Sequence, residues 1–393
     1  MSDAPLDLAV VGLGAAGASL AHRLAGTGAR FAVWEAPASS AARTQERTWC
    51  TWGPGAGPDA GPGPFGPLVA ARWSRLRVIA PGGAVLHLDL GGWRYRMLRS
   101  TDVERAVRAR LAAAGVPLVE AVVDELVPAP GGVRVGAGGP LARAVLDTRP
   151  VPLPRAPGTT TLLQHFLGHR VRAARPVFDP GAVTLMDFRV PQPAGGVAFG
   201  YVLPTSEREA LVEYTEFSAD LLTGAQYRER LDAWTERAGF GALEVLGTER
   251  GVIPMTDAPF PASDVPGVVR FGAAAGAVRP STGYAFSVLQ RQADALAARV
   301  AAGAPPVPPR PHGRRHLLMD AVLLAGIASG WLDGAAVLWR LFERNPVQRV
   351  LGFLDGATGP ADDVRLMASS PRVPMLAAVA ELGRRRARGA LER

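Results

Sequence analysis

The chain contains one cysteine, Cys50, and no lysine among its 393 residues. A single thiol cannot close an internal disulfide or build a cysteine cluster for zinc or iron–sulfur, so packing must hold the fold. We find no metal-ligand spacing and predict no metal site. All 43 basic residues are arginines and the net charge is +8. Because alanine, glycine and proline are also abundant, GC-rich codon usage explains the arginines, and we expect no nucleic-acid partner.

Long apolar runs are also missing. The closest is the stretch 321–332, well short of the ~20 apolar residues that span a bilayer. The sequence begins with an acid, Asp3, where a signal peptide carries basic residues. Hydrophobic residues at 48% and charged residues at 20% predict a folded chain of about two to three domains. We expect a cytoplasmic protein, either soluble or peripheral to a membrane.

A glycine-rich turn follows the first predicted strand. Residues 6–36 have the pattern strand, turn, helix, strand. Gly12 allows the tight turn, Gly14 lets the backbone approach a pyrophosphate, and Gly17 lets the helix pack closely on the strand. Glu35 ends the second strand 18 residues after Gly17, where a carboxylate can bind adenosine ribose hydroxyls. The pattern predicts a dinucleotide at the helix N-terminus, and Glu35 favours FAD or NAD over a 2′-phosphorylated nucleotide.

A second glycine-rich element lies far downstream. It contains Gly272, Gly276, Thr282 and Gly283, between a predicted strand and a long predicted helix. Flavoproteins use a return element of this kind to hold the ribityl and flavin end of FAD, whereas a domain that binds only NAD does not need one. The alternative is an ordinary tight junction between strand and helix.

The predicted fold class is α/β. We expect a Rossmann-like FAD-binding domain of the glutathione reductase type, an inserted antiparallel β-sheet substrate domain and a helical carboxy-terminal region. The predicted parts are the first part of the FAD domain at 1–160, the substrate domain at 161–260, the return element at 261–303 and the helical region at 304–393. The glycine- and proline-rich segment 53–67 is predicted as a flexible loop.

Several longer segments resemble one family. The chain is similar over nearly its whole length to the bacterial and plant lycopene cyclases, FAD-dependent enzymes that form carotenoid rings. Besides the glycine fingerprint, the matching segments are residues 47–52 (RTWCTW), 93–100 (WRYRMLRS), 164–168 (QHFLG), 186–188 (MDF), 211–215 (LVEYT), 251–255 (GVIPM) and 281–284 (STGY). The fingerprint occurs in many flavoproteins, whereas the tryptophan-rich, glutamate-centred and Thr-Gly-Tyr segments are much more specific.

Two positions depart from related patterns. Flavin hydroxylases of the same architecture usually carry Gly-Asp in the second glycine element, where this chain has Gly272 and Ala273. This difference disfavours an oxygen-activating monooxygenase. Many lycopene cyclases carry a second acid directly after the catalytic glutamate, and here Tyr214 stands in that place.

The resemblance implies that Glu213 is the catalytic acid. Cyclisation of a ψ end group begins with protonation of C2, the C5–C6 double bond attacks the resulting C1 cation, and loss of the C6 proton completes a β ring without net oxidation. The acid must be protonated, and an apolar tunnel raises the pKa of a carboxyl by desolvation. Strand alternation places Leu211, Glu213, Thr215 and Phe217 on one face. The alternative is an exposed strand glutamate.

Four aromatic residues are candidates for lining the path of the cation. The rings of Trp49, Trp52, Trp93 and Tyr284 would each stabilise a positive charge by ~0.5–2 kcal/mol. The alternative for each is an ordinary place in the core. The resemblance further implies reduced FAD, whose negative charge stabilises the cation, with NAD(P)H needed only to keep the flavin reduced.

The implied substrate, lycopene, is a forty-carbon hydrocarbon dissolved in the bilayer. The resemblance therefore implies peripheral contact with the inner face of the cell membrane. The region 317–342, flanked by Arg314, Arg315, Arg340 and Arg344, fits an interfacial amphipathic element. A pair of helices packed on the core fits it equally well.

Two other classes of function compete with a cyclase. An FAD-dependent monooxygenase or a geranylgeranyl-type reductase acting on a lipid would consume NAD(P)H with each product. A non-catalytic carrier of prenyl chains would not depend on Glu213. The sequence leaves open whether one or both ends are cyclised, the ring type, the exact carotenoid and the oligomeric state.

Overall fold

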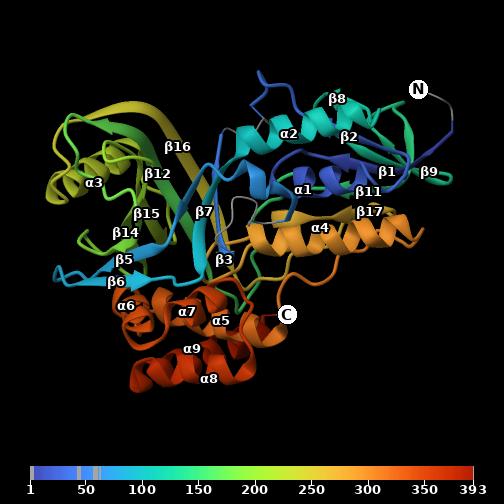
Figure 1. The fold of residues 1–393 in the computed structure, drawn as a ribbon. Helices are drawn as coiled ribbons and strands as arrows, with labels where there is room; N and C mark the ends of the chain where they lie inside the picture. The colour runs from blue at the N-terminus through green and yellow to red at the C-terminus, as the bar shows by residue number, and fades with distance from the viewer. Residues whose placement is uncertain (1–3, 42–45, 56–60, 62, 393) are drawn as a thin grey trace.

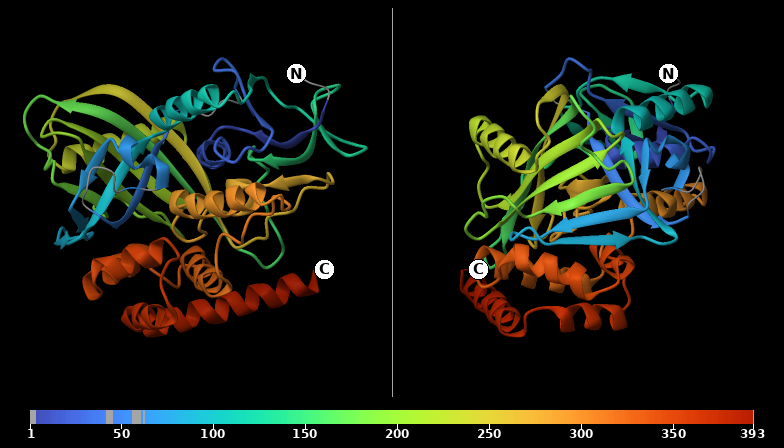
Figure 2. Two further views of the ribbon diagram at one scale, coloured as in Figure 1. Left: turned by 45° about the vertical axis from the view of Figure 1, so that its right-hand side comes forward. Right: turned by 60° about the vertical axis from the view of Figure 1, so that its left-hand side comes forward.

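The computed structural model describes residues 4–41, 46–55, 61 and 63–392. Figure 1 shows three parts: a sheet with its helices at the upper right, a strongly curved sheet at the left, and a layer of carboxy-terminal helices below both. Figure 2 shows the same layer of helices from two further sides. Residues 56–60 and 62 of the predicted loop lie outside the described residues. Its end is regular, because Gly63–Leu68 forms a 3₁₀-helix around the buried Phe65.

The first sheet is built on short, continuous apolar runs, which are typical of strands buried on both faces. Its order is β8 (Leu118–Glu120), β2 (Phe31–Glu35), β1 (Leu6–Val11), β11 (Leu141–Asp147), β10 (Gly132–Val135) and β9 (Leu126–Ala129), with β17 (Val268–Arg270) also on β11. The pairs of β1, β2, β8, β11 and β17 are parallel. Around it lie α1 (Ala15–Leu24), α2 (Ser100–Ala113) and α4 (Phe286–Ala301). The expected Rossmann-like domain is confirmed, and β17 brings the downstream glycine element back to it.

The second sheet is mostly antiparallel. Its order is β16 (Leu243–Thr256), β12 (Thr161–Ala173), β15 (Glu209–Ser218), β14 (Val197–Pro204), β13 (Ala182–Asp187), β5 (Arg75–Ile79) and β6 (Val85–Asp89). All its pairs are antiparallel except β13 with β5. One face is covered by α3 (Gly224–Arg237).

This sheet differs from the predicted boundaries, because β5 and β6 come from the part of the chain that we assigned to the FAD domain. The alternate residues Leu76 and Val78 of β5 are fully buried in the core of the second sheet. The pairing of β5 with β13 joins residues about a hundred positions apart, which local sequence patterns do not reveal. A third, small sheet of β3 (Thr48–Pro54), β7 (Trp93–Arg99) and β4 (Ala71–Trp73) comes from the same stretch of the chain.

The carboxy-terminal layer consists of α5 (Arg314–Ala328), α6 (Gly334–Arg344), α7 (Val347–Leu354), α8 (Pro360–Ser369) and α9 (Arg372–Leu391). The apolar face of α6, including Leu338 and Phe342, is buried in the same core as the second sheet. For region 317–342 we considered an interfacial amphipathic element and a pair of helices packed on the core. The helix α6 within this region packs on the core. Within the described residues, no helix is both long and apolar enough to cross a membrane.

A buried ion pair joins this layer to the loop before α4. Arg279 and Asp320 are 1% and 0% exposed at their side chains, with Nη2 of the arginine 3.1 Å from Oδ1 of the aspartate. The hydroxyl of Ser281 donates to the same Oδ1 at 2.6 Å. The guanidinium also lies over the ring of Phe353, 4.6 Å from its centroid. The loop that contains Gly283 is thus tied to α5.

Candidate active site

A cavity of about 340 Å³ lies where the first domain meets the second sheet. Strands β12, β14, β15 and β16 form one wall, and Ala15 at the start of α1 and the loop 281–285 form another. Most lining side chains are apolar or aromatic, with a few polar groups among them. This composition is typical of a site for a largely apolar ligand that is oriented by a small number of polar contacts.

Glu213 lies on the cavity wall in β15. The residues Leu211, Glu213, Thr215 and Phe217 all line the cavity, as strand alternation predicted. The carboxyl is buried, and its Oε1 accepts a hydrogen bond from the hydroxyl of Thr215 at 2.6 Å. Burial and, secondarily, the charge of Glu249 raise the pKa of Glu213 to about 8, against the opposing hydrogen bond from Thr215. Glu213 is therefore a protonated carboxylic acid at neutral pH, facing an apolar space.

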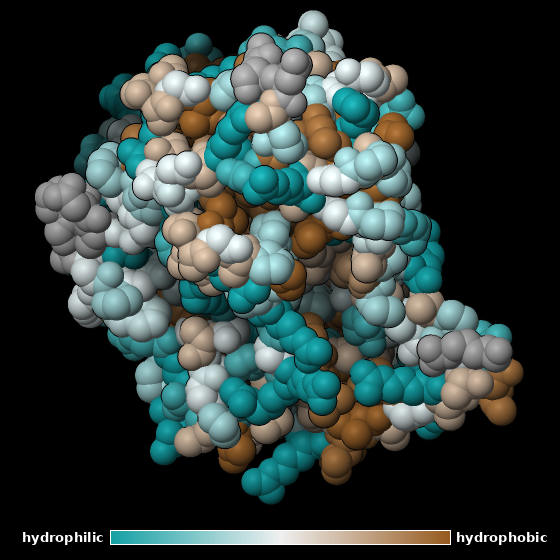
Figure 3. Space-filling view, turned by 90° about the vertical axis from the view of Figure 1, so that its right-hand side faces the viewer, coloured by the Kyte–Doolittle hydropathy of each residue, from teal (hydrophilic) through white to brown (hydrophobic). Residues whose placement is uncertain are grey.

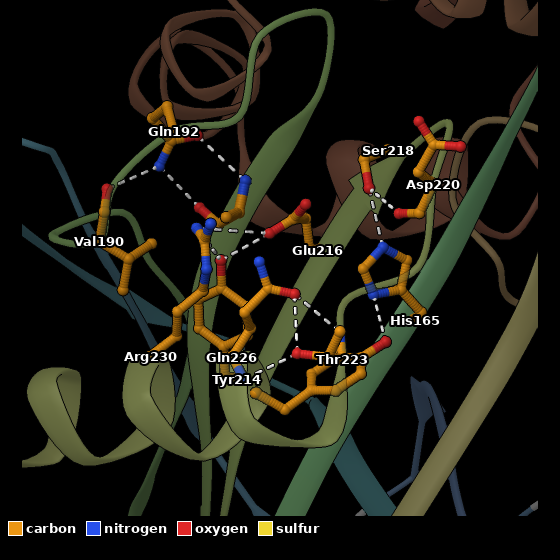
Figure 4. A network of polar contacts seen from close by, with 12 residues as sticks. His165, Val190, Gln192, Tyr214, Glu216, Ser218, Asp220, Thr223, Gln226 and Arg230 are labelled. Atoms are coloured by element: carbon orange, nitrogen blue, oxygen red, sulfur yellow. Dashed lines mark hydrogen bonds and ion pairs between the residues drawn. The ribbon is translucent and has the colours of Figure 1, made fainter.

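The alternate residues of the same strands point the other way. Figure 4 shows Tyr214, Glu216 and His165 on the side of the sheet toward α3. The hydroxyl of Tyr214 donates to Oε2 of Glu216 at 2.7 Å, and Arg230 of α3 lies 3.7 Å from the same oxygen. Nε2 of His165 is 2.8 Å from the hydroxyl of Ser218. An acid at position 214 would therefore face α3, so the tyrosine there removes no group from the cavity.

The structure separates the four aromatic candidates into two pairs. Trp49 and Tyr284 line the cavity, and the indole of Trp49 stacks on Phe286 with ring centroids 5.2 Å apart. Trp52 and Trp93 do not line it, which corrects their placement in the substrate pocket. Trp52 is buried, edge-on to Tyr284 with centroids 4.5 Å apart, and its Nε1 donates to the backbone of α7. Trp93 lies at the start of β7 and packs on the core.

Sequence reasoning missed a second buried carboxyl at the cavity, Glu249 of β16. Its Oε1 accepts from the backbone N–H of Thr48 and its Oε2 from the hydroxyl of Thr48, both at 2.7 Å. Burial raises the pKa of Glu249, while the hydrogen bonds from Thr48 oppose the shift. One signal in the sequence could have identified Glu249. It lies two residues before Gly251, the first residue of a segment that matches the family, and residues two apart on a strand share a face.

A chain of hydroxyl and thiol groups also reaches the wall. Sγ of Cys50 lies 3.2 Å from the hydroxyl of Tyr201, which lies 2.8 Å from that of Tyr95. Cys50 and Tyr201 line the cavity, whereas Tyr95 is completely buried behind it. Burial raises the pKa of the Cys50 thiol to about 12, so it is uncharged at neutral pH.

The first glycine turn fits a dinucleotide. A Cβ on Gly14, which opens α1, would meet no atom within 4 Å, so the space beside the helix N-terminus is free for a phosphate. In contrast, a Cβ on Gly17 would lie 1.9 Å from the carbonyl oxygen of Gly12, which itself has a φ of +95°. Glu35 is buried at the end of β2, and its carboxylate accepts from the backbone N–H of Leu13 within the turn. Gly12, Gly14 and Gly17 therefore form the turn between β1 and α1, and Glu35 is hydrogen-bonded to that turn.

The last residues of the downstream glycine-rich element reach the cavity. Thr282 and Gly283 line the cavity, whereas Gly272 and Gly276 do not. A Cβ on Gly272 would lie 2.6 Å from the Cβ of Ala16, so this glycine lets the element pack on α1. Gly276 packs on Phe260 in the same way.

One unpartnered group on the opposite wall faces this element. Oε1 of Gln164 is buried and has no hydrogen-bond partner among the described residues. It lies 1.8 Å from where a Cβ on Gly283 would stand, so position 283 requires a glycine. The free amide oxygen is available to a bound group.

The fold is that of FAD-dependent flavoproteins. A geranylgeranyl bacteriochlorophyll reductase-like protein from Thermoplasma acidophilum superposes with a TM-score of 0.66 at 15% identity, covering 96% of this chain and 99% of its own. The p-nitrophenol 4-monooxygenase of Pseudomonas putida gives 0.57 at 17% identity, covering 97% and 99%. At such identities the likeness establishes the fold alone.

The sequence comparisons define the family. The family described as "Lycopene cyclase protein" matches residues 7–380, so the chain belongs to the lycopene cyclase family. A lycopene beta-cyclase of Pseudescherichia vulneris is 30% identical over 328 residues, 79% of this chain and 80% of the relative. Another, from Paracoccus sp. (strain N81106 / MBIC 01143), is 29% identical over 63% of this chain and 65% of its own length. The chain is an enzyme of the lycopene cyclase type, and the expected family is confirmed.

Proposed function

We propose that the enzyme cyclises the ψ end groups of lycopene, or of a related acyclic carotenoid, to β rings without net oxidation. The observation that carries this proposal is Glu213: a buried carboxyl on the wall of an apolar cavity, held by one hydroxyl, with a pKa that burial raises to about 8. A neutral carboxylic acid in an apolar site is the group that protonation of an alkene requires. The named activity of the two relatives agrees with this chemistry.

In this mechanism the O–H of Glu213 gives its proton to C2 of the end group. The π electrons of the C1–C2 bond form the new C2–H bond and leave a cation at C1. The C5–C6 π electrons then close the ring and move the charge to C5. The rings of Trp49 and Tyr284 line the same cavity as Glu213 and would stabilise the passing cation by ~0.5–2 kcal/mol each. The apolar wall around them limits water, which would otherwise trap the cation.

The site fits FAD through residues of both glycine elements. The pyrophosphate would lie beside Gly14, the adenosine ribose near Glu35, and the flavin end in the cavity beside Gly283 and Gln164. When bound in its reduced form, FAD supplies negative charge close to the cation, and NAD(P)H serves only to keep it reduced. A monooxygenase or a reductase would instead oxidise one NAD(P)H for each product.

Two glycine substitutions test cofactor binding. Gly14→Val fills open space, so the apo protein should keep a thermal midpoint close to the wild type while FAD no longer co-purifies. Gly17→Ala places a Cβ against a backbone carbonyl in the same turn, so this control should destabilise the fold itself. FAD retained at full stoichiometry by Gly14→Val would contradict the proposed site.

Ring formation tests the activity directly. Pigments from a lycopene-accumulating bacterial host that expresses the protein should contain β rings. In deuterated water with reduced flavin, the purified enzyme should place one deuterium at C2 of each new ring and consume no NAD(P)H per ring. Oxidation of one NAD(P)H per product would replace the cyclase with a monooxygenase or reductase.

We also propose contact with the inner face of the cell membrane. Exposed apolar side chains lie at helical spacing on α8 and α9: Val364 and Met367, then Val373, Leu376 and Val379. Figure 3 shows apolar residues among hydrophilic ones at the lower edge of the molecule, the side of these helices. Arg365 and Arg372 are exposed beside them. Sedimentation with anionic vesicles should exceed that with neutral vesicles and weaken with salt, and negligible binding to both would refute it.

A further inference from the structure

The second sheet places Glu213 and Glu249 at the same level of the cavity wall. Strand β12 lies between β15 and β16, and its residue Gly168 is paired with Glu213 on one side and with Glu249 on the other. Residues directly opposite one another share a face, and both carboxyls line the cavity. Neighbouring strands are ~4.8 Å apart, so the two backbones are separated by about 10 Å.

The residue between them on β12 is a glycine. A Cβ at position 168 would lie 3.3 Å from Oε2 of Glu213 and 3.2 Å from Leu211. A larger side chain there would stand between the two carboxyls. The sheet therefore presents two acids to one cavity, and the β12 residue paired with both of them has no side chain of its own.

Their hydrogen bonds differ in a way that favours opposite protonation states. Glu249 accepts two hydrogen bonds from Thr48, one from a backbone N–H, and these stabilise a carboxylate. Glu213 accepts one, from a hydroxyl. The charge of Arg47 also favours ionised Glu249, and ionised Glu249 in turn raises the pKa of Glu213. Burial raises the pKa of both carboxyls, but the hydrogen bonds from Thr48 and the charge of Arg47 oppose that rise at Glu249. These contacts favour the proton on Glu213 and the negative charge on Glu249, an arrangement that assigns an acid and a base.

We propose that Glu249 is the proton acceptor that completes the ring, an inference that rests on the proposed function. After closure the positive charge is at C5. The C6–H bond breaks, its electron pair forms the C5–C6 double bond, and the proton passes to a carboxylate oxygen of Glu249. Glu213 is then ionised and Glu249 neutral, and between turnovers Glu249 loses its proton to solvent while Glu213 takes one from solvent, which restores the starting state. Atoms and electrons balance without an oxidant or a reductant.

The same residue would determine the ring type. A cation at C5 loses a proton readily from C6, from C4 or from the methyl group on C5, and only the first loss gives a β ring. Deprotonation of such a cation is easier than protonation of an alkene, so loss of the acceptor should cost less rate than loss of the acid, and it should also change the position from which the proton leaves. A carboxylate fixed at both oxygens by Thr48 is a base of defined position.

The test compares Glu249→Gln with Glu244→Gln. Glu244 lies on the same strand, is exposed and contacts Arg172, so its variant should match the wild type in rate and product. Glu249→Gln should retain FAD, lose about 100-fold in rate, and yield a mixture in which rings formed by proton loss from C4 or the methyl group replace part of the β rings. Glu249→Asp should restore part of the β-ring fraction.

Unchanged rate and pure β rings from Glu249→Gln would overturn this inference while leaving the proposed function intact. A wild type that forms no ring at all would instead refute the proposed function.

A second measurement serves if Glu249→Gln does not fold. Besides Arg47 and Glu213, the charged groups around Glu249 are Glu46, Arg99, Arg170 and Glu209, which line a smaller adjoining cavity. With these unchanged, Thr48→Val removes one hydrogen bond that favours the carboxylate. The acidic limb of the pH–rate profile, where Glu249 ionises, should shift to higher pH. An unmoved limb would contradict the assignment.

Discussion

Glu213 and Glu216 lie three residues apart on one strand, and both are buried, yet they face opposite sides of the sheet. On the side toward α3, Glu216 accepts from Tyr214 and lies near Arg230. On the cavity side, Glu213 has a hydroxyl as its partner, and burial raises its pKa to about 8. A buried carboxyl group that is paired with a cation and a phenol contributes to the stability of the fold. A buried carboxyl group that desolvation keeps protonated can act as an acid. Burial alone does not distinguish these two roles.

The largest expected effect comes from removing the acid of the cavity face. Glu213→Gln keeps the size and polarity of the side chain but cannot protonate an alkene. We expect a loss of ~10,000-fold or more in ring formation, with folding and FAD content unchanged. Turnover assays on purified protein would measure it, and a variant within tenfold of the wild type would show that another group donates the proton.

The next effect is the pH dependence of the wild type. Because the pKa of Glu213 is raised to about 8, its reactive neutral form predominates below that pH, and the rate should fall about tenfold per pH unit well above it. A raised folded-state pKa favours the fold at low pH. Relative to Glu213→Gln, the wild type should therefore lose unfolding free energy as the pH rises from about 4.5 to about 8.

Denaturant titrations of both proteins at pH 5 and pH 8.5 would measure this difference. The same stability gap at the two pH values would contradict a buried neutral Glu213.

On the face of the sheet toward α3, a substitution should lower stability and leave the rate of ring formation nearly unchanged. Glu216→Gln removes the carboxylate beside Arg230 and Tyr214, so the free energy of unfolding should fall by about 1–3 kcal/mol. The rate of ring formation should stay within about threefold, because this side chain does not line the cavity. A large loss of activity in a stable variant would end the distinction between the two faces.

The smallest effect should come from Thr215→Val. In the wild type, the hydroxyl of Thr215 donates to Glu213 and lowers the pKa of Glu213. The valine removes this hydroxyl, so the pKa of Glu213 should rise. The alkaline limb of the pH–rate profile should shift upward by less than about one pH unit, while the rate at pH 7 hardly changes. A downward shift would mean that the hydroxyl favours the neutral acid instead.

Local patterns predicted the parts of the site that lie within one element. The alternation around Glu213 and the glycine turn around Gly14 needed no partner strand to be understood, and both have the expected geometry. The return of Gly283 to the first domain followed from a repeated strand–glycine–helix pattern.

Features that depend on which strands pair could not be predicted. Glu249 and Glu213 are 36 positions apart in the chain. They come to the same level of the cavity wall because β12 pairs with both of their strands. Trp52 and Trp93 belong to a small sheet whose position decides which side chains reach the cavity. The place of β5 beside β13 was hidden for the same reason.

The ion pair between Arg279 and Asp320 makes the carboxy-terminal helices part of one cooperative unit with the loop before α4. Asp320→Ala would leave a guanidinium that is 1% exposed without its carboxylate, a loss that commonly costs ~3–5 kcal/mol. Backbone amides of the loop and of α5 should therefore exchange with solvent together, in a single opening event. A fragment that ends after α4 should lose the shape of the loop 281–285 even though the first glycine turn remains intact.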